Sequence, residues 1–472
     1  MLITSSWCYL ALAALAVLGA VVADGPKELM IQMKYPIDFD WPDEGTRETA
    51  LADGSYKPIN TIPTGIKVFK NIVYLCVPRW YDGIASTLNV VEGKKYEIGE
   101  QPKLTPWPDW SWQNASDCDR GIAFSMSVEI DPKGRVWVLD TGNNNLYERD
   151  TSLHKFFCPP SVLVFDAETK ELLTRFHLPE EIASPETNFL NDIVVDPVND
   201  WAYISDNDGK WREGRGGVIA VQPFNKTATR LQGLTTNPEK RAESYIMGGK
   251  RWNSNNPVNS IALHPSGDWV YYAPNTGYIV HMISTADMQD TSLTPQERDA
   301  RSLVVGQKPT PSASLKFASN GTMFFSGLTM DAMLAWTWGG GLLDNTWWVA
   351  YQDHEDMQFL DQLDFDERGY DTPNPEGSNL WWITNQLFEF VFNKEAKDWT
   401  VNIFKAAVDT SDYGDAIMDG EMTVTYVPTS PASDGDGDGI ALASDATSDA
   451  SSLLFTNVSA FTLMLALITF QW

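Results

Sequence analysis

The sequence predicts an all-β fold, a six-bladed β-propeller. The first observation is a unit of strand, tight turn and second strand, clearest in residues 127–144, where the turn Asp131–Gly134 separates an alternating run from an aromatic and β-branched run. The second is that the unit recurs, with turns near residues 131, 196, 264 and 319, far enough apart for four-stranded blades. The further copies lie at residues 67–75, 193–206, 261–272, 315–326 and 363–383. A β-sandwich with coincidental turns is the alternative.

Composition fits one large domain with tails. Aromatic residues make up 12% of the chain, including 19 tryptophans, which suits sheets that stack face to face through bulky side chains. The formal net charge of −29 disfavours nucleic acid and anionic membrane surfaces as partners and favours cationic ligands. An acidic surface that serves only solubility explains the same charge.

The first 23 residues predict a secretory signal peptide. They contain no charged side chain and carry an apolar run at residues 9–18, followed by small residues before Asp24. We expect cleavage after Ala23, with Ala20 as the second choice. An N-terminal membrane anchor is less favoured because the run is too short to span a bilayer.

The cysteines that remain after signal removal predict one disulfide. Cys118 and Cys158 flank the clearest repeat in loop-like contexts, so we pair them, with an expected stabilisation of about 4 kcal/mol. Cys76 lies in a strand-like run and is expected to be a buried free thiol. Glycosylation sequons at Asn114, Asn225 and Asn320 also fit an exported protein.

Several short motifs stand out between about residues 30 and 400. They are Tyr35–Pro42, Gly54–Pro58, Val77–Trp80, Pro106–Trp110 and Arg135–Gly142. Together they resemble the major royal jelly protein/yellow family. The resemblance implies a secreted six-bladed propeller, which we place at residues 24–405. Many members carry a cysteine at the turn that Lys133 and Gly134 occupy here, so the family's disulfide pattern is not transferred.

Beyond residue 405 the composition changes. Residues 406–452 are expected to form an acidic linker rich in Ser, Asp and Gly. Within it, residues 434–445 place acids at the spacing of a calcium-binding loop, although a disordered acidic linker explains the same residues. No other cofactor is expected.

The apolar tail at residues 453–472 predicts a glycolipid (GPI) anchor signal, with lipid attachment near Ser444 or Ser448. A transmembrane helix is the alternative, but no basic residue follows the tail. We therefore expect an extracellular protein, secreted or held at the cell surface, that contacts membrane only through this tail.

Polar residues recur at two positions of the repeat, the end of the second strand and the start of the first strand. In a propeller both positions lie at the same end of the central channel. Small-molecule sites favour such mouths. Turn propensity alone also places Asp and Asn there. The residues are Asp140, Asp206 and Asn275 at or after second strands, and Asn191 and Asn259 at first strands.

The family resemblance implies that this mouth binds biogenic amines or related catechol and indole compounds, or converts dopachrome. An acidic mouth with aromatic side chains suits a cationic aromatic ligand. The family's amine-contact segment maps onto Asn345 and Trp347, with Thr329 upstream. For dopachrome tautomerisation, Asp140 or Asp206 would move the proton.

Two other functions compete with amine binding. In a metal-dependent, lactonase-like hydrolase, the oxygens of Asp140, Asn191, Asp206, Asn259 and Asn275 would hold a divalent cation. In the third reading, the protein is an extracellular structural or nutritive protein without a small ligand. No nucleophile elbow, zinc-type histidine pair or phosphate loop is visible in the sequence.

Overall fold

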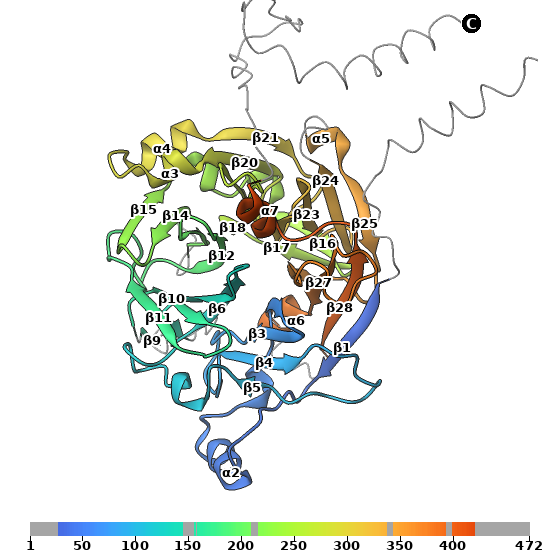
Figure 1. Ribbon diagram of the computed structural model, residues 1–472. Helices are drawn as coiled ribbons and strands as arrows, with labels where there is room; N and C mark the ends of the chain where they lie inside the picture. Colours follow the sequence, from blue (N-terminus) through green and yellow to red (C-terminus); the bar gives the residue numbers. More distant parts are fainter. Residues whose placement is uncertain are drawn as a thin grey trace, which may run out of the picture. The chain divides into compact units, whose positions relative to one another are not determined.

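The computed structural model describes residues 27–144, 155–156, 158–208, 216–337, 343–392 and 399–420 (Figure 1). The expected signal peptide, the calcium-like segment 434–445, the lipid attachment sites and the apolar tail lie outside these residues. None of the helices in the described ranges is long and apolar enough to span a membrane.

Six four-stranded antiparallel sheets are arranged as the blades of a propeller, as the repeats predict (Figure 1). Each repeated unit forms the first two strands of one blade. The first strands, which surround the central axis, are β2 (Gly65–Phe69), β6 (Ser125–Ile130), β12 (Leu190–Asp196), β18 (Val258–Leu263), β22 (Leu315–Phe317) and β26 (Leu360–Phe365). The second strands are β3 (Ile72–Cys76), β7 (Arg135–Asp140), β13 (Trp201–Asp206), β19 (Trp269–Pro274), β23 (Thr322–Gly327) and β27 (Ser378–Thr384).

The ring is closed by the N-terminal strand. β1 (Glu28–Lys34) pairs antiparallel with β28 (Thr400–Val408) and so supplies the fourth strand of the sixth blade. The third strands of the first five blades are β4 (Leu88–Glu92), β10 (Ser161–Asp166), β14 (Gly217–Gln222), β20 (Ile279–Ser284) and β24 (Ala332–Thr337). Their fourth strands are β5 (Thr105–Pro106), β11 (Leu172–His177), β15 (Thr227–Leu231), β21 (Leu303–Gln307) and β25 (Trp348–Gln352).

Hairpins and short helices fill the connections. The hairpins are β8 (Asn143–Asn144) with β9 (Lys155–Phe156) and β16 (Ser244–Met247) with β17 (Lys250–Asn253). The α-helices are α2 (Glu44–Asp53), α3 (Thr285–Gln289), α4 (Pro295–Arg301), α5 (Leu343–Thr346), α6 (Leu387–Phe392) and α7 (Tyr413–Asp419). The 3₁₀ helices are η1 (Pro58–Asn60), η2 (Trp110–Gln113), η4 (Leu234–Thr236) and η5 (Lys240–Ala242).

The repeated turn is held by its aspartate. In the second blade, the Asp131 carboxylate accepts hydrogen bonds from the backbone N–H groups of Lys133 and Arg135 and from the Trp137 indole, the last at 2.9 Å. Gly134 adopts a φ of 73°, a left-handed conformation that the turn requires. The turn residue and the tryptophan of the following strand thus form one structural unit.

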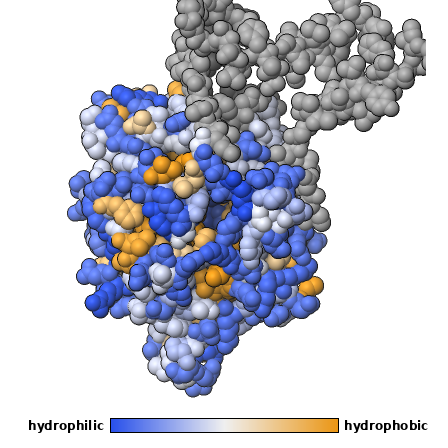
Figure 2. Space-filling model, viewed as in Figure 1, coloured by the Kyte–Doolittle hydropathy of each residue, from blue (hydrophilic) through white to orange (hydrophobic). Residues whose placement is uncertain are grey.

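Tryptophans pack between neighbouring blades. Trp137 is fully buried against residues of the third blade, including Ile193 and Ile204. Trp381 and Trp382 are buried in the sixth blade. Replacing such a side chain by alanine typically costs about 3–5 kcal/mol. The outer surface is different, since the face seen in Figure 2 is largely hydrophilic with only small apolar patches.

The cysteine assignment is confirmed. Cys118 and Cys158 form a disulfide across a sequence separation of 40 residues. Cys76 is a buried free thiol on β3, with its Sγ 3.2 Å from Ser125 Oγ. Burial raises the pKa of the Cys76 thiol to about 12, so the group stays protonated and unreactive.

The predicted end of the propeller at residue 405 is too early. β28 continues to Val408, and the segment after it returns to the propeller, where Tyr413 at the start of α7 is 2% exposed. The absence of basic residues after Lys405 made this segment resemble a linker. Its Asp412 instead pairs with the buried Lys316 of the channel, and Asp415 and Asp419 pair with Arg368.

Candidate functional site

The central channel is blocked by a buried ion-pair network near the end where the first strands finish. Lys67 Nζ on β2 lies 3.3 Å from Glu129 on β6 and 3.3 Å from Asp364 on β26. Lys316 Nζ on β22 lies 3.3 Å from Glu129, 3.2 Å from Asp364 and 2.8 Å from Asp412. We call this the turn end of the channel, because the first-to-second-strand turns lie there.

Tyr413 completes the closure of the turn end. Its hydroxyl accepts a hydrogen bond from Val195 N at 2.9 Å and donates to Val195 O at 3.1 Å. Lys316 Nζ lies 4.8 Å from the centre of the Tyr413 ring. Burial opposes the charge of Lys316, but the surrounding carboxylates outweigh it and hold its pKa well above the ordinary value.

A second polar layer lies one step further along the first strands. The Asp192 carboxylate accepts hydrogen bonds from Ser127 Oγ at 2.8 Å and from Gln362 Nε2 at 2.9 Å. Burial raises the pKa of Asp192 to about 6. This layer separates the ion-pair network from the opposite mouth, where the first strands begin.

At that opposite mouth lies a small polar cavity of about 60 Å³, which we call the chamber. Carboxamides, aromatic rings and one carboxylate line it. Among the described lining residues, Asp361 is the single titratable group. The carboxamides are Asn191, Asn207, Asn253, Asn256, Asn259 and Asn275, and the rings are Trp80, Phe189, Phe359 and Phe388.

Strand bulges aim side chains into the chamber. In β6, β12, β18 and β26 the pairing register with the second strand shifts at one residue, which is Met126, Asn191, Asn259 and Asp361 respectively. All four line the chamber. A bulge turns one side chain out of the regular alternation, and such features are frequent beside functional sites. Four blades therefore direct the same strand position into one cavity.

The carboxamides are fixed by hydrogen bonds. Asn191 Nδ2 donates to Asn259 O at 3.1 Å, and Asn207 Nδ2 donates to Asn259 Oδ1 at 2.6 Å. Asn259 Nδ2 donates to Ala313 O at 2.9 Å. Asn275 Nδ2 donates to Ser312 O at 3.2 Å, while its Oδ1 has no hydrogen-bond partner in the described part of the chain. Because Asn275 is only 4% exposed, this oxygen is an unsatisfied acceptor at the chamber wall.

Asp361 is the charged group of the chamber. Its Oδ2 accepts a hydrogen bond from Asn385 Nδ2 at 2.7 Å. Burial is the main cause that raises the pKa of Asp361 to about 7, and the nearby Asp192 carboxylate adds to the effect. None of the described residues that line the chamber with it is a lysine or arginine, so among them Asp361 lacks a cation such as those that the Glu129, Asp364 and Asp412 carboxylates have at the turn end.

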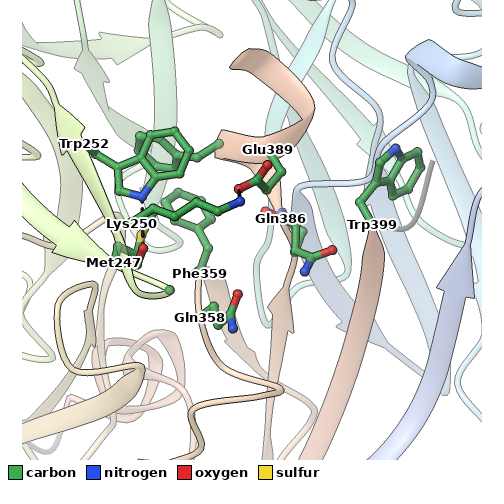
Figure 3. A pocket seen from close by; sticks show the side chains of 11 residues that line it. Met247, Lys250, Trp252, Gln358, Phe359, Gln386, Glu389 and Trp399 are labelled. Atoms are coloured by element: carbon green, nitrogen blue, oxygen red, sulfur yellow. Dashed lines mark hydrogen bonds and ion pairs between the residues drawn. The ribbon is translucent and has the colours of Figure 1, made fainter. Parts of the chain in front are cut away.

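A larger cavity of about 360 Å³, the vestibule, lies between the β16–β17 hairpin and α6 (Figure 3). Phe359 and Phe388 line both the vestibule and the chamber. The Trp252 and Phe388 rings are 4.8 Å apart, and Lys250 forms an ion pair with Glu389 across the cavity. Asn385 lines the vestibule while it donates to Asp361. The hairpin and α6 therefore roof the chamber.

The structure brings together three of the predicted site residues. Asn191, Asn259 and Asn275 all line the chamber, as their equivalent positions in the repeats suggested. Their role in binding stays a prediction.

The two carboxylates expected to be catalytic do not line the chamber. Asp140 accepts hydrogen bonds from the backbone N–H groups of Ala123 and Phe124 at 2.9 and 2.8 Å. Asp206 accepts from Phe189 N at 3.0 Å and from Arg230 Nη2 at 2.6 Å. Both carboxylates anchor the chain that leads into a first strand, so their lone pairs are used by the fold. Their roles in catalysis and as cation ligands stay predictions.

The amine-contact residues expected from the family are placed apart from the chamber. Thr329, in the β23–β24 loop, lies at the chamber end of its blade, but its hydroxyl donates to Thr310 Oγ1 at 2.8 Å and it does not line the cavity. Asn345 and Trp347 belong to the connection between β24 and β25. Because successive strands are antiparallel, this third-to-fourth-strand connection lies at the turn end of the blade. The side chain of Asn345 lies outside the described residues.

Sequence reasoning missed Asp361, Asn207 and Asn385. A signal for Asp361 was present, because it holds the same place in Leu360-Asp361-Gln362 that Asn191 and Asn259 hold in their repeats. Asn207 directly follows the second strand β13, a position at which polar residues recur in the repeats. Asn385 and the roof belong to connections that no repeat predicts.

The comparisons with known proteins agree with the sequence motifs. The chain is 34% identical over 435 residues to Protein yellow of Drosophila madeirensis, covering 85% of this chain and 69% of that protein. It is 37% identical over 404 residues to Protein yellow of Drosophila yakuba, covering 79% and 68%. It is 28% identical over 313 residues to Major royal jelly protein 6 of Apis mellifera, covering 65% and 67%.

Solved structures match more distantly. A luciferin-regenerating enzyme gives a TM-score of 0.42 at 11% identity, covering 81% of this chain and 97% of that one. A gluconolactonase of Xanthomonas campestris gives 0.41 at 11% identity, with the same coverage. Matches this remote say nothing of chemistry. The major royal jelly protein family model, in contrast, matches residues 125–417, and with the relatives above it shows that the chain belongs to the major royal jelly protein family.

Proposed function

We propose that the protein binds a small cationic aromatic ligand, an amine or an oxidised catechol relative, at the roofed mouth of the propeller channel. The observation that carries the proposal is Asp361. A strand bulge aims this carboxylate into a cavity of carboxamides and aromatic rings, and the described lining residues include no basic side chain to neutralise it. An ammonium group supplies the missing partner.

The chamber offers each part of such a ligand a matching group. Asp361 pairs with the ammonium, and charge-assisted hydrogen bonds of this kind are among the stronger ones in proteins. The unsatisfied Oδ1 of Asn275 accepts a hydrogen bond from a ring hydroxyl or an amine N–H. The rings of Phe359 and Phe388 add apolar contact and cation–π attraction of about 0.5–2 kcal/mol.

The sizes of the two cavities indicate where each end of the ligand binds. The chamber, at about 60 Å³, holds the ammonium end only. The vestibule, at about 360 Å³, falls in the usual range of small-molecule sites, roughly 300–1,000 Å³. The aromatic ring therefore occupies the vestibule side, next to Trp252 and Phe388. Binding across both cavities requires Phe388, which lines both of them, to turn aside.

The same carboxylate suits proton transfer. Tautomerisation of a dopachrome-type compound moves one proton from carbon to a second site and needs no redox cofactor, only a base within hydrogen-bond reach. A carboxylate with a pKa of about 7 is partly ionised at neutral pH and can both take and return a proton. Asp361 thus replaces Asp140 and Asp206 as the candidate base.

We place this activity outside the cell. The Cys118–Cys158 disulfide fits an oxidising compartment, and the family resemblance implies secreted members. The signal peptide and the lipid-anchor tail belong to the same proposal. Cell fractionation after phospholipase treatment measures the relative amounts of secreted and surface-held protein.

Metal-dependent hydrolysis is the rival outcome. Within the described ranges no three His, Cys, Asp or Glu side chains come together as a metal site. The carboxamide oxygens around Asp361 are nevertheless the hard donors that Ca²⁺ accepts. The experiment therefore includes Ca²⁺ and EDTA arms.

Calorimetry of dopamine and serotonin binding tests the proposal. Asp361→Asn is expected to weaken binding at least about tenfold, because the ammonium loses its charge partner. Glu389→Gln is the matched control, since this vestibule carboxylate is already paired with Lys250, and affinity is expected to stay within about twofold. Undiminished binding to Asp361→Asn would contradict the proposal. Absence of amine binding together with Ca²⁺-dependent lactone hydrolysis would replace it.

A further inference from the structure

A surface groove of about 1,180 Å³ lies beneath α2, on the rim of the propeller. In Figure 1, α2 projects from the ring of blades. Ala50 is the buried residue of this helix, and an Asp43 N-cap and the Arg47–Asp38 ion pair at 2.8 Å hold it. The described residues therefore leave a groove open beneath α2.

The floor of the groove carries an aromatic platform. Trp41 and Trp110 stack with their ring centres 4.9 Å apart, and both are half-buried. Trp110 Nε1 donates to Asp40 O at 3.0 Å, which fixes the plane of the indole. The carboxylates of Asp43 and Asp82 also line the groove. A flat aromatic face beside hydrogen-bond acceptors is suited to a sugar ring, which has an apolar face and hydroxyl donors.

Asn114, the acceptor of the first glycosylation sequon, lines this groove. Its side chain is exposed, and its Oδ1 accepts hydrogen bonds from Ser116 N at 3.2 Å and Ser116 Oγ at 2.9 Å. Nδ2, the atom that glycosylation modifies, makes no hydrogen bond within the described part of the chain. The nitrogen is therefore available at the edge of the aromatic platform.

The loop that carries Asn114 is rigidly held. Cys118 anchors it to Cys158, and Arg175 donates to the backbone carbonyls of Cys118 and Gly121. The disulfide also forms in the oxidising compartments in which sequons are glycosylated. A glycan attached here leaves the protein from a fixed point.

We propose that the N-linked glycan of Asn114 lies in the groove, with its first sugars against Trp110 and their hydroxyls donating to Asp43 and Asp82. In the covalent step, Nδ2 loses a proton and forms a bond to the anomeric carbon of a lipid-diphosphate-linked oligosaccharide. The bond from that carbon to the diphosphate breaks, and the lipid diphosphate leaves. Because the sugar is tethered, its local concentration is of the millimolar order, so weak contacts suffice to hold it. The glycan then completes the underside of α2.

Two further sequons, at Asn225 and Asn320, provide the contrast. Asn225 lies in the β14–β15 connection and Asn320 in the turn between β22 and β23. Both are exposed, and neither lines the groove. Glycans at these positions project into solvent.

The test uses the full chain secreted from eukaryotic cells, with site occupancy mapped by mass spectrometry. Under native conditions, a glycosidase that releases whole N-glycans is expected to act at least about fivefold more slowly at Asn114 than at Asn225, since the Asn114 glycan is bound. Trp110→Ala is expected to remove most of the difference. Amide exchange of residues 41–55 is expected to increase in Asn114→Gln and to stay unchanged in Asn225→Gln.

If Trp110→Ala does not fold, the exchange measurement on the native chain before and after enzymatic glycan release decides the matter. An unoccupied Asn114 would overturn the inference. Equal rates of glycan release at Asn114 and Asn225 would also overturn it. So would amide exchange in α2 that does not depend on the Asn114 glycan.

Discussion

The two ends of the propeller channel treat buried charge in opposite ways. At the turn end, Glu129, Asp364 and Asp412 each lie within 3.3 Å of a lysine nitrogen. At the chamber end, the side-chain partner of Asp361 within the described ranges is the Asn385 amide, and Asn275 Oδ1 has no partner there. Both ends are built from the same strand repeat. We infer from this difference that the turn end serves stability, and the proposed function assigns ligand binding to the chamber end.

The largest expected effect is at the turn end. Lys316→Met should lower the free energy of unfolding by about 3–5 kcal/mol, because it leaves three buried carboxylates short of a cation. Urea unfolding followed by fluorescence measures the change. Lys95→Met is the matched control, since the exposed Lys95–Glu28 pair should contribute less than about 1 kcal/mol. Equal effects of the two substitutions would remove the distinction drawn for the turn end.

A smaller effect is expected from Tyr413→Phe. The substitution keeps the ring but leaves the buried N–H and C=O of Val195 without their side-chain partner, at a cost of about 2 kcal/mol. Amine affinity should not change, because Tyr413 closes the far end. A loss of amine binding with intact folding would mean that the two ends are coupled.

The smallest expected effect on stability is an increase, caused by Asp361→Asn. Folding raises the pKa of Asp361 from 3.8 to about 7, so the native protein binds this proton more tightly and loses stability as pH rises between those values. Asparagine has no proton to lose. Asp361→Asn should therefore match the wild type at pH 4 and exceed it above pH 7, by on the order of 1 kcal/mol after allowance for partial exposure. Thermal melts across this range check the sign, and a variant less stable than wild type at pH 8 would contradict it.

Much of the fold could be predicted because the repeat is local. The six strand pairs follow from turn residues such as Asp131 and from the runs beside them. β1 could not be predicted as the fourth strand of the last blade, because its pairing with β28 joins opposite ends of the chain. Residues 406–419 were misassigned because Asp412 pairs with Lys316, which lies on a strand distant in the sequence.

The candidate site could be predicted only where it follows the repeat. Asn191 and Asn259 occupy the second position of a first strand, and the sequence identified both. Asp361 has that position too. The sixth copy of the repeat is recognisable in the sequence only from Leu363, close to its turn, so Asp361 falls outside the matched segment. The roof, with Trp252 and Phe388, is formed by a hairpin and a helix from two different blades, and single-sequence patterns do not reveal that contact.

Proton release on amine binding tests the central claim most directly. If the ammonium pairs with Asp361, binding at pH 7 should release about half a proton per ligand, because a carboxyl that is half protonated becomes ionised. Calorimetry in two buffers of different ionisation enthalpy measures this number. Affinity should also rise roughly tenfold from pH 6 to pH 8. The account predicts that Asp361→Asn abolishes the proton release, whereas binding without proton release in the wild type, or equal release in the variant, would contradict it.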